Sequence, residues 1–203
     1  MISVNIDKLI NMSLDDKKTY GELAKNVLDE LNGEKTFAVV TGGMGSFKLA
    51  YSLYEMKKKV LFIDADISSE IFVGKYKLGK NIPGVVDFIS DVQKTPNIIC
   101  HTNKEGFDII FSGSNEIGKI NKENEIIIKG LIESFGKGYD VVIVDSDISG
   151  TAAKYVYASV VMVDEDKYEE EELESLVKDL ELVGCNIKGV IINEQNWWIY
   201  RNG

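Results

Sequence analysis

Six short apolar runs limit the folds open to this chain more than any other feature. Each run has four or five residues, is rich in Val, Ile and Phe, and is mostly apolar at consecutive positions rather than at alternate ones. Consecutive apolar residues are typical of parallel strands that are buried on both faces of a sheet. The runs are residues 36–40, 60–63, 108–111, 141–144, 160–163 and 189–192.

Helical patterns occupy gaps between these runs. Apolar residues spaced three and four apart predict helices over residues 20–31, 47–54 and 173–183. We expect the first helix to begin at a capping box of Thr19 and Glu22 and to stop before Gly33. Alternating strands and helices along the whole length predict an α/β fold with a mainly parallel sheet.

No repeat or proline-rich linker divides the chain, so we predict one α/β domain over residues 1–203. Residues 1–33 form its N-terminal helical segment, and residues 94–106 read as an irregular loop. Residues 194–203 form an aromatic tail, which either packs back on the domain or docks a partner. The acidic stretch from Asp164 to Glu174 is interpreted as a solvated first turn of a helix, with a docking surface for a basic partner as the alternative.

The composition excludes several classes of function. The chain has 33 acidic and 23 basic residues, a formal charge of −10 and a pI near 4.7, which argue against nucleic acid as a partner. No apolar run approaches the roughly 20 residues of a membrane helix, and the first residues do not have the pattern of a secretory signal. His101 is the only histidine, and the two cysteines lack metal-ligand spacing. We therefore predict a cytoplasmic location.

A glycine-rich segment follows the first apolar run and precedes a helical pattern. It contains a set of candidate phosphate-binding residues: Gly42, Gly43, Met44, Gly45, Ser46 and Phe47. A turn of this kind presents backbone N–H groups to an anion at the start of a helix. On its own, such a turn is a weak signal.

Acids at the ends of two other runs strengthen this interpretation. Asp64 and Asp66 end the second run, and Asp145 and Asp147 end the fourth. Carboxylates at the carboxyl ends of parallel strands, beside such a loop, are placed to hold a metal on a nucleotide phosphate. For Asp147 an equally good interpretation is that it caps a helix near residues 151–157.

Taken in order, these segments resemble the deviant Walker ATPases, and most closely the bacterial tyrosine kinases of capsule and exopolysaccharide synthesis. The resemblance covers roughly residues 18–194 and predicts a three-layer P-loop NTPase-like fold. The similar segments are Gly43-Met44-Gly45, Ile63-Asp64-Ala65-Asp66, Pro83-Gly84-Val85-Val86-Asp87-Phe88-Ile89, Ile109-Ile110-Phe111-Ser112-Gly113, Tyr139-Asp140-Val141-Val142-Ile143-Val144-Asp145 and Gly189-Val190-Ile191-Ile192-Asn193.

The resemblance implies roles for particular residues. Asp64, Asp66 and Asp145 match the catalytic acids, and Asp64 and Asp145 would manage magnesium if Mg·ATP binds. Asn193 matches an asparagine that reads adenine in the family.

The departures from the family pattern concern its charged groups. Ser46 stands where the phosphate-binding lysine is expected, and Phe47 stands where the magnesium-binding hydroxyl is expected. The extra lysine of the deviant loop aligns with Thr41. Lys48 points elsewhere on the helix, and Lys35 lies at the far end of its strand, so neither replaces the lost lysine.

We therefore expect a non-catalytic relative with no bound nucleotide. At most an inorganic anion would lie on the N–H groups of residues 43–47, and Ser46→Lys should regain weak binding. The expected partner is a membrane-associated polysaccharide-assembly protein or a paralogous kinase, with recruitment to the inner face of the membrane; a homo-oligomer is also open. One alternative is an active ATP-dependent tyrosine kinase with an unusual loop, and another is a pseudo-ATPase that localises a pilus or secretion machine.

Overall fold

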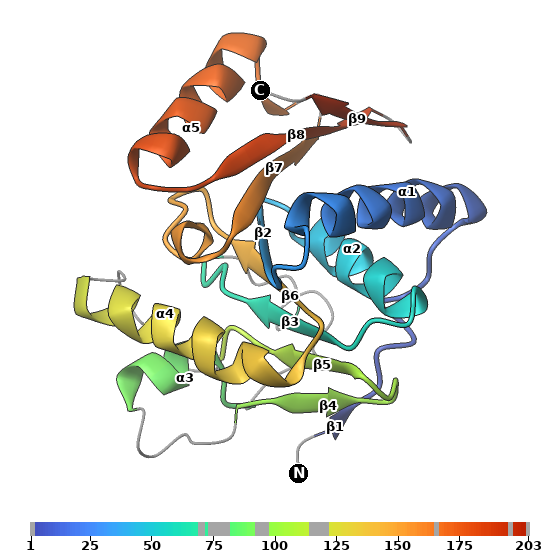
Figure 1. Cartoon of the computed structure of the whole chain (residues 1–203), viewed down its shortest axis with the longest axis vertical. Helices are drawn as coiled ribbons and strands as arrows, with labels where there is room; N and C mark the ends of the chain where they lie inside the picture. Colours follow the sequence, from blue (N-terminus) through green and yellow to red (C-terminus); the bar gives the residue numbers. More distant parts are fainter. Residues whose placement is uncertain are drawn as a thin grey trace.

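The computed structural model describes residues 3–68, 72, 82–91, 98–113, 122–164, 167–194 and 197–201. These residues form a nine-stranded sheet flanked by helices (Figure 1). In chain order the elements are β1 (Ser3–Val4), α1 (Leu14–Leu31), β2 (Thr36–Val40), α2 (Met44–Glu55), β3 (Val60–Asp64), α3 (Val85–Ser90), β4 (Cys100–Thr102), β5 (Phe107–Ile110), α4 (Lys122–Phe135), β6 (Val141–Ser146), β7 (Ala158–Asp164), α5 (Glu170–Leu182), β8 (Ile187–Glu194) and β9 (Trp197–Arg201).

The strand order is β1-β4-β5-β3-β6-β2-β7-β8-β9. The six central strands, β5-β3-β6-β2-β7-β8, are all parallel to one another. At the two sides of this group, β4 pairs antiparallel with β5, and β9 pairs antiparallel with β8. All six predicted strands are therefore present in a mainly parallel sheet. The predicted α/β P-loop NTPase-like fold is confirmed.

The fold has three layers, with the sheet between two layers of helices and a hydrophobic core on each face of the sheet. On one face α1 and α2 pack against residues such as Phe37 and Val39 of β2. On the other face α3, α4 and α5 pack against their neighbours Ala38 and Val40 (Figure 1). This alternation within one strand explains why the strand runs are continuously apolar, because both faces of the sheet are buried.

The N-terminal helix begins earlier than its apolar stripe predicted. The capping box is Ser13 with Asp16, not Thr19 with Glu22, and the helix starts at Leu14. Apart from the exposed Leu14, the first turn is polar and carries no apolar stripe, so the apolar spacing does not reveal it. The predicted stop is correct: the helix ends at Leu31, and its cap residue Asn32 is left-handed, with φ of 44°.

Three other predictions need correction or completion. Residues 100–102 lie within the predicted irregular loop but form β4, a short strand held by its pairing with β5; residues 94–97 lie outside the described residues. The predicted helix near residues 151–157 is only a 3-10 turn over Ala153–Tyr155, which follows Gly150 in a left-handed conformation with φ of 67°. In the aromatic tail, residues 197–201 form β9 and extend the sheet, whereas residues 195, 196, 202 and 203 lie outside the described residues.

Candidate functional site

The glycine-rich loop lies at the carboxyl end of β2, between this strand and α2. Thr41 has a left-handed backbone with φ of 61°, and its hydroxyl donates a hydrogen bond of 2.6 Å to the carbonyl of Met162 on β7. At Gly42 a Cβ atom would lie 2.4 Å from Cγ1 of Val39, so a larger residue does not fit there. Thr41 thus binds the loop to the next strand, whereas the family pattern has a lysine at this position.

Four of the five N–H groups of residues 43–47, which were expected to cradle an anion, donate hydrogen bonds within the protein. Gly43 N–H donates to a carboxylate oxygen of Asp145 at 3.2 Å. The N–H groups of Gly45 and Ser46 donate to the Gly42 carbonyl at 2.8 and 3.4 Å, and that of Phe47 donates to the Gly43 carbonyl at 3.4 Å. In this structure these four N–H groups therefore already have acceptors within the protein, and anion binding by them stays a prediction.

The side chains of Ser46 and Phe47 point away from solvent. Ser46 is fully buried, and its hydroxyl donates to the Gly43 carbonyl at 2.6 Å, which further ties the loop to the first turn of α2. Phe47 is also fully buried and makes edge-on contacts with Phe62 and Phe107 at ring distances of 5.4 and 5.6 Å. Phe47 therefore serves the core, and any contribution it makes to a ligand comes from its backbone.

Two acids meet beside this loop. Asp64 on β3 and Asp145 on β6 are directly opposite one another in the sheet register, and both are buried. Asp64 accepts a hydrogen bond from the Ser112 N–H at 3.3 Å. Burial raises the pKa of Asp64 to about 7, and repulsion from Asp66 adds to it, while hydrogen bonds from Ser112 lower it.

Asp145 is affected in the same direction. Burial, followed by repulsion from Asp64 and Asp66, raises the pKa of its carboxyl well above the ordinary value, although hydrogen bonds from the loop oppose this. In the described residues no lysine or arginine forms an ion pair with either acid. The sequence brought these two acids together correctly, but it did not predict that one of them would bind the loop itself.

The other two predicted acids are less central. Asp66 is partly exposed and accepts hydrogen bonds from the N–H and the hydroxyl of Ser68. Asp147 accepts from the N–H and the hydroxyl of Ser149 at 3.1 and 2.5 Å, so it closes a local turn. It does not cap the 3-10 turn over Ala153–Tyr155, whose cap residue is Ala152, so the capping interpretation is wrong. Within the described part of the chain, no three His, Cys, Asp or Glu residues are arranged so that they could hold a metal ion.

An open cleft of about 780 Å³ adjoins the loop on the side of β7. It extends from the start of α1 across the loop to Asp164, and Lys48 lies in its wall. Lys48 is paired with Asp16 at 3.3 Å and lies 5.5 Å from the ring centre of Tyr20, so it does not replace the missing lysine. In β8 the predicted adenine-reading residue Asn193 is the register partner of Asp164, which puts its backbone beside this cleft.

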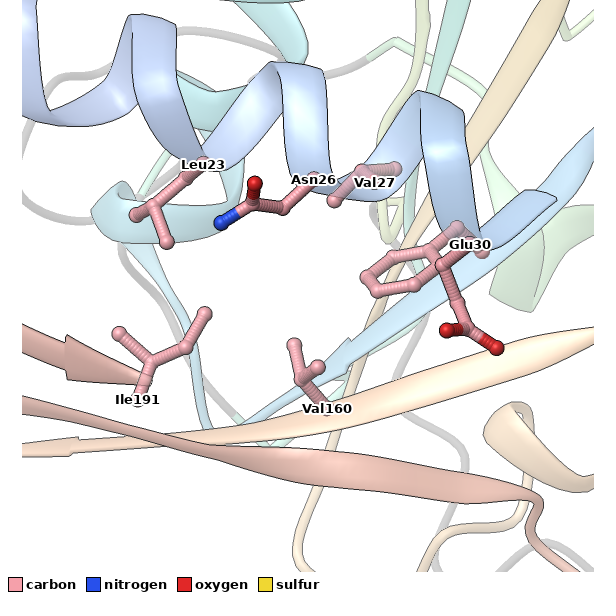
Figure 2. A pocket seen from close by; sticks show the side chains of 7 residues that line it. Leu23, Asn26, Val27, Glu30, Val160 and Ile191 are labelled. Atoms are coloured by element: carbon pink, nitrogen blue, oxygen red, sulfur yellow. The ribbon is translucent and has the colours of Figure 1, made fainter. Parts of the chain in front are cut away.

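A second groove is too small for such a role. Figure 2 shows it between α1 and the sheet, with Leu23 and Val27 above Val160 and Ile191. Its volume of about 10 Å³ leaves room for a water molecule at most. We interpret it as a packing gap under α1.

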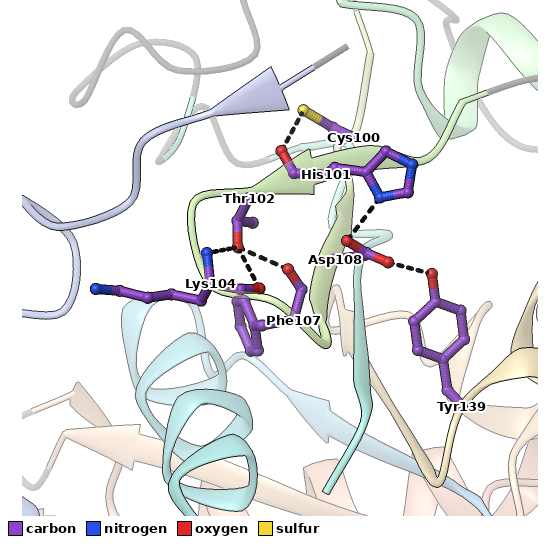
Figure 3. Close-up of polar contacts among 7 residues, drawn as sticks. All are labelled: Cys100, His101, Thr102, Lys104, Phe107, Asp108 and Tyr139. Atoms are coloured by element: carbon purple, nitrogen blue, oxygen red, sulfur yellow. Dashed lines mark hydrogen bonds and ion pairs between the residues drawn. The ribbon is translucent and has the colours of Figure 1, made fainter. Parts of the chain in front are cut away.

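A polar network that the sequence did not predict lies at the amino ends of the strands, opposite the loop. Figure 3 shows Asp108 of β5 between His101 and Tyr139. His101 Nδ1 lies 2.9 Å from one carboxylate oxygen, and the Tyr139 hydroxyl donates to the other at 2.7 Å. Burial, together with Asp108, raises the pKa of the Tyr139 hydroxyl. The network joins β4, β5 and the start of β6, and we interpret it as structural.

Comparison with known proteins agrees with this architecture. A family profile described as "AAA domain" matches residues 37–194, so the chain belongs to this family. Over 192 residues it is 24% identical to tyrosine-protein kinase CpsD of Streptococcus pneumoniae serotype 4, a match that covers 86% of this chain and 82% of that protein. It is 29% identical over 168 residues to a putative tyrosine-protein kinase in the cps region of Klebsiella pneumoniae, covering 80% of this chain but 22% of that protein.

Among solved structures, the kinase domain of Escherichia coli tyrosine kinase ETK superposes on this chain with a TM-score of 0.69 at 20% identity. The match covers the whole of this chain and 93% of that domain. The chain is thus related to the tyrosine kinase domains of capsule and exopolysaccharide systems. No helix in the described residues is long and apolar enough to span a membrane.

Proposed function

We propose that this chain is a non-catalytic relative of the cytoplasmic tyrosine kinases of capsular and exopolysaccharide synthesis. It acts by binding a membrane-associated assembly protein or a paralogous kinase, which recruits it to the inner face of the membrane. The observation that carries the proposal is the hydrogen bond from Gly43 N–H to Asp145. In this bond a backbone N–H of the loop binds a carboxylate of the same chain, whereas in a kinase such an N–H group would bind a phosphate of the nucleotide.

The electrostatics of the loop support this proposal. A triphosphate entering here would approach Asp64 and Asp145 with no lysine from the loop to offset them. Losing one charge-assisted hydrogen bond costs roughly 1.5–3 kcal/mol, or about 10- to 150-fold in affinity. The N–H groups of the loop would also have to leave their present acceptors.

The loss of the magnesium ligand points in the same direction. Phe47 fills a position in the aromatic core, where it is fully buried among Phe62 and Phe107. A hydroxyl cannot be supplied from this position without removing a large part of that packing. The loop therefore serves the stability of the domain rather than the coordination of a nucleotide.

One alternative has a specific observation in its favour. Asp64, Asp66 and Asp145 are all retained, and the relative CpsD, which matches over 82% of its length, is described as a tyrosine-protein kinase. Under this alternative the chain is an ATP-dependent kinase whose loop opens when Mg·ATP binds.

Calorimetry of the full chain with Mg·ATP and Mg·ADP separates the two functions. We expect no binding heat at nucleotide concentrations up to about 1 mM, and no phosphotyrosine after incubation with Mg·ATP. Micromolar binding by the wild type that is lost in Asp145→Asn but kept in the neighbouring control Asp147→Asn would contradict the proposal. It would establish that the acids of a working nucleotide site are in use.

A further inference from the structure

The β9 strand is one edge of the sheet, and its outer side pairs with no other strand in the described residues (Figure 1). On its inner side it pairs antiparallel with β8, with Ile199 opposite Ile192. Alternate residues of such a strand direct their N–H and C=O groups away from the sheet. These groups are a template for another strand.

Within residues 197–201, three of the usual features that prevent strand pairing are absent: a proline, a bulge and a charge in the middle of the strand. Four of its five residues are Trp197, Trp198, Ile199 and Tyr200, which are strong strand formers, and none is proline. The register runs without a bulge along the whole strand. The one charge is on Arg201, at its end.

We propose that β9 pairs antiparallel with β9 of a second copy of this chain, with the two Ile199 residues opposite each other. The two sheets then join across a twofold axis into one continuous sheet. In this register 199 lies opposite 199, 198 opposite 200 and 197 opposite 201, so paired residue numbers differ by zero, two or four. Alternate residues direct their N–H and C=O groups to the same edge of a strand, so the residues whose groups point outward in one copy face such residues in the other. The pairing supplies about four to six backbone hydrogen bonds, whichever alternate set faces outward.

The residue types fit this register. Trp198 lies opposite Tyr200 of the second copy, and Trp197 lies opposite its Arg201. Aromatic pairs and pairs of an aromatic with a cationic residue are among the cross-strand pairs that stabilise sheets. A second copy fits better than a head-to-tail chain through the other sheet edge, because β1 there has only two residues, Ser3 and Val4.

The first experiment uses charge at the twofold axis. The mass of the wild-type chain, measured by light scattering, should be twice the chain mass of 22.6 kDa. Ile199→Lys and Ile199→Glu should each halve this mass, because like charges lie directly opposite each other. Mixing the two variants should restore the dimer, since lysine then faces glutamate. This rescue distinguishes pairing from a local loss of structure.

The second experiment does not depend on a charge being tolerated. Ile199→Cys should form a disulfide-linked dimer under mild oxidation, because the two residues face one another and the native Cys100 and Cys185 are buried. Leu182→Cys, at an 84% exposed position at the end of α5, is the control and should remain a monomer on a non-reducing gel.

Three results would overturn the proposal. If the wild type is monomeric at about 100 μM, β9 does not pair with a second copy, and only a strand of another protein could pair with it. A dimer unchanged by Ile199→Lys would place the interface elsewhere, and equal crosslinking of the Leu182→Cys control would show only random collision. None of these readouts depends on nucleotide binding, so this inference stands or falls separately from the proposed function.

Discussion

Removing the carboxylate of Asp64 should stabilise the protein at neutral pH. The side chain is buried on β3 opposite Asp145, and its pKa rises to about 7 from an ordinary value of 3.8. Because the folded-state pKa is above the unfolded one, the folded protein holds a proton that the unfolded chain releases. Stability therefore falls as pH rises from about 4 to about 7, and it stays low above that range.

The size of this effect follows from the pKa. A carboxyl whose pKa rises from 3.8 to about 7 lowers the free energy of unfolding by about 4 kcal/mol once it is fully ionised. The pI near 4.7 makes pH 5.5 a practical lower limit for soluble protein. Between pH 5.5 and 8 Asp64 alone should cost about 2 kcal/mol, and Asp145, whose pKa is also raised, changes stability in the same direction.

Asp64→Asn should remove the Asp64 part of this pH dependence. The amide oxygen can still accept the Ser112 N–H, but the buried amide hydrogens reduce the gain by about 1–3 kcal/mol. The variant should therefore be more stable than wild type at pH 8 and lose that advantage at pH 5.5. Urea unfolding at both pH values, followed by circular dichroism, measures the difference.

Asp147→Asn is the matched control, because it removes a partly exposed carboxylate that binds Ser149 at the end of β6. Its free energy of unfolding should show the same pH dependence as wild type. The reasoning would be refuted if Asp64→Asn lost as much stability as wild type between pH 5.5 and 8.

Two further substitutions test the closed loop. Gly45→Ala should lower the free energy of unfolding by about 1–3 kcal/mol, because a Cβ atom there would lie 2.3 Å from the Met162 sulfur. Its control, Gly21→Ala in α1, has open space around it and should raise the free energy of unfolding by about 0.5–1 kcal/mol. Equal effects of the two substitutions in a thermal melt would show that the loop is not packed as described. Ser46→Lys should unfold at a lower temperature than wild type, because it places a charge at a fully buried position. It should still show no calorimetric binding of Mg·ATP at millimolar nucleotide. Micromolar binding would mean that the loop opens easily.

The sequence predicted the strands well because their burial pattern is local. Residues 60–64 form β3 one residue beyond the predicted run, and residues 36–40 form β2 as predicted. Helix α4 was missed although Ile128, Leu131 and Ile132 supply a buried apolar face at helical spacing.

The elements at the sheet edges were less predictable for a physical reason. Residues 100–102 are a strand only because β5 offers a partner, and the sequence Cys-His-Thr has no apolar pattern of its own. Tertiary pairing decides the conformation of such segments, and strand propensity contributes little.

The sequence predicted which residues lie around the loop, but it did not predict the hydrogen bonds that the loop makes with them. Which residues surround the loop followed from the order of the motifs, since acids at the ends of parallel strands must meet at one edge of the sheet. The hydrogen bond between Gly43 and Asp145 joins residues 102 positions apart, so no local pattern reports it. For the same reason the sequence suggested an open cradle where the structure has a closed one.

The closed loop and the missing lysine have one physical origin. A buried carboxylate that loses its cationic partner must find another donor, because an unsatisfied buried charge is costly. Beside Asp145, the Gly43 N–H of the loop is such a donor. Ser46, the residue that replaces the lysine, then donates to the Gly43 carbonyl and fixes that peptide from its other side. The substitution that removes a phosphate ligand thus also supplies a hydrogen bond that holds the loop shut, and a return to nucleotide binding requires more than one changed side chain.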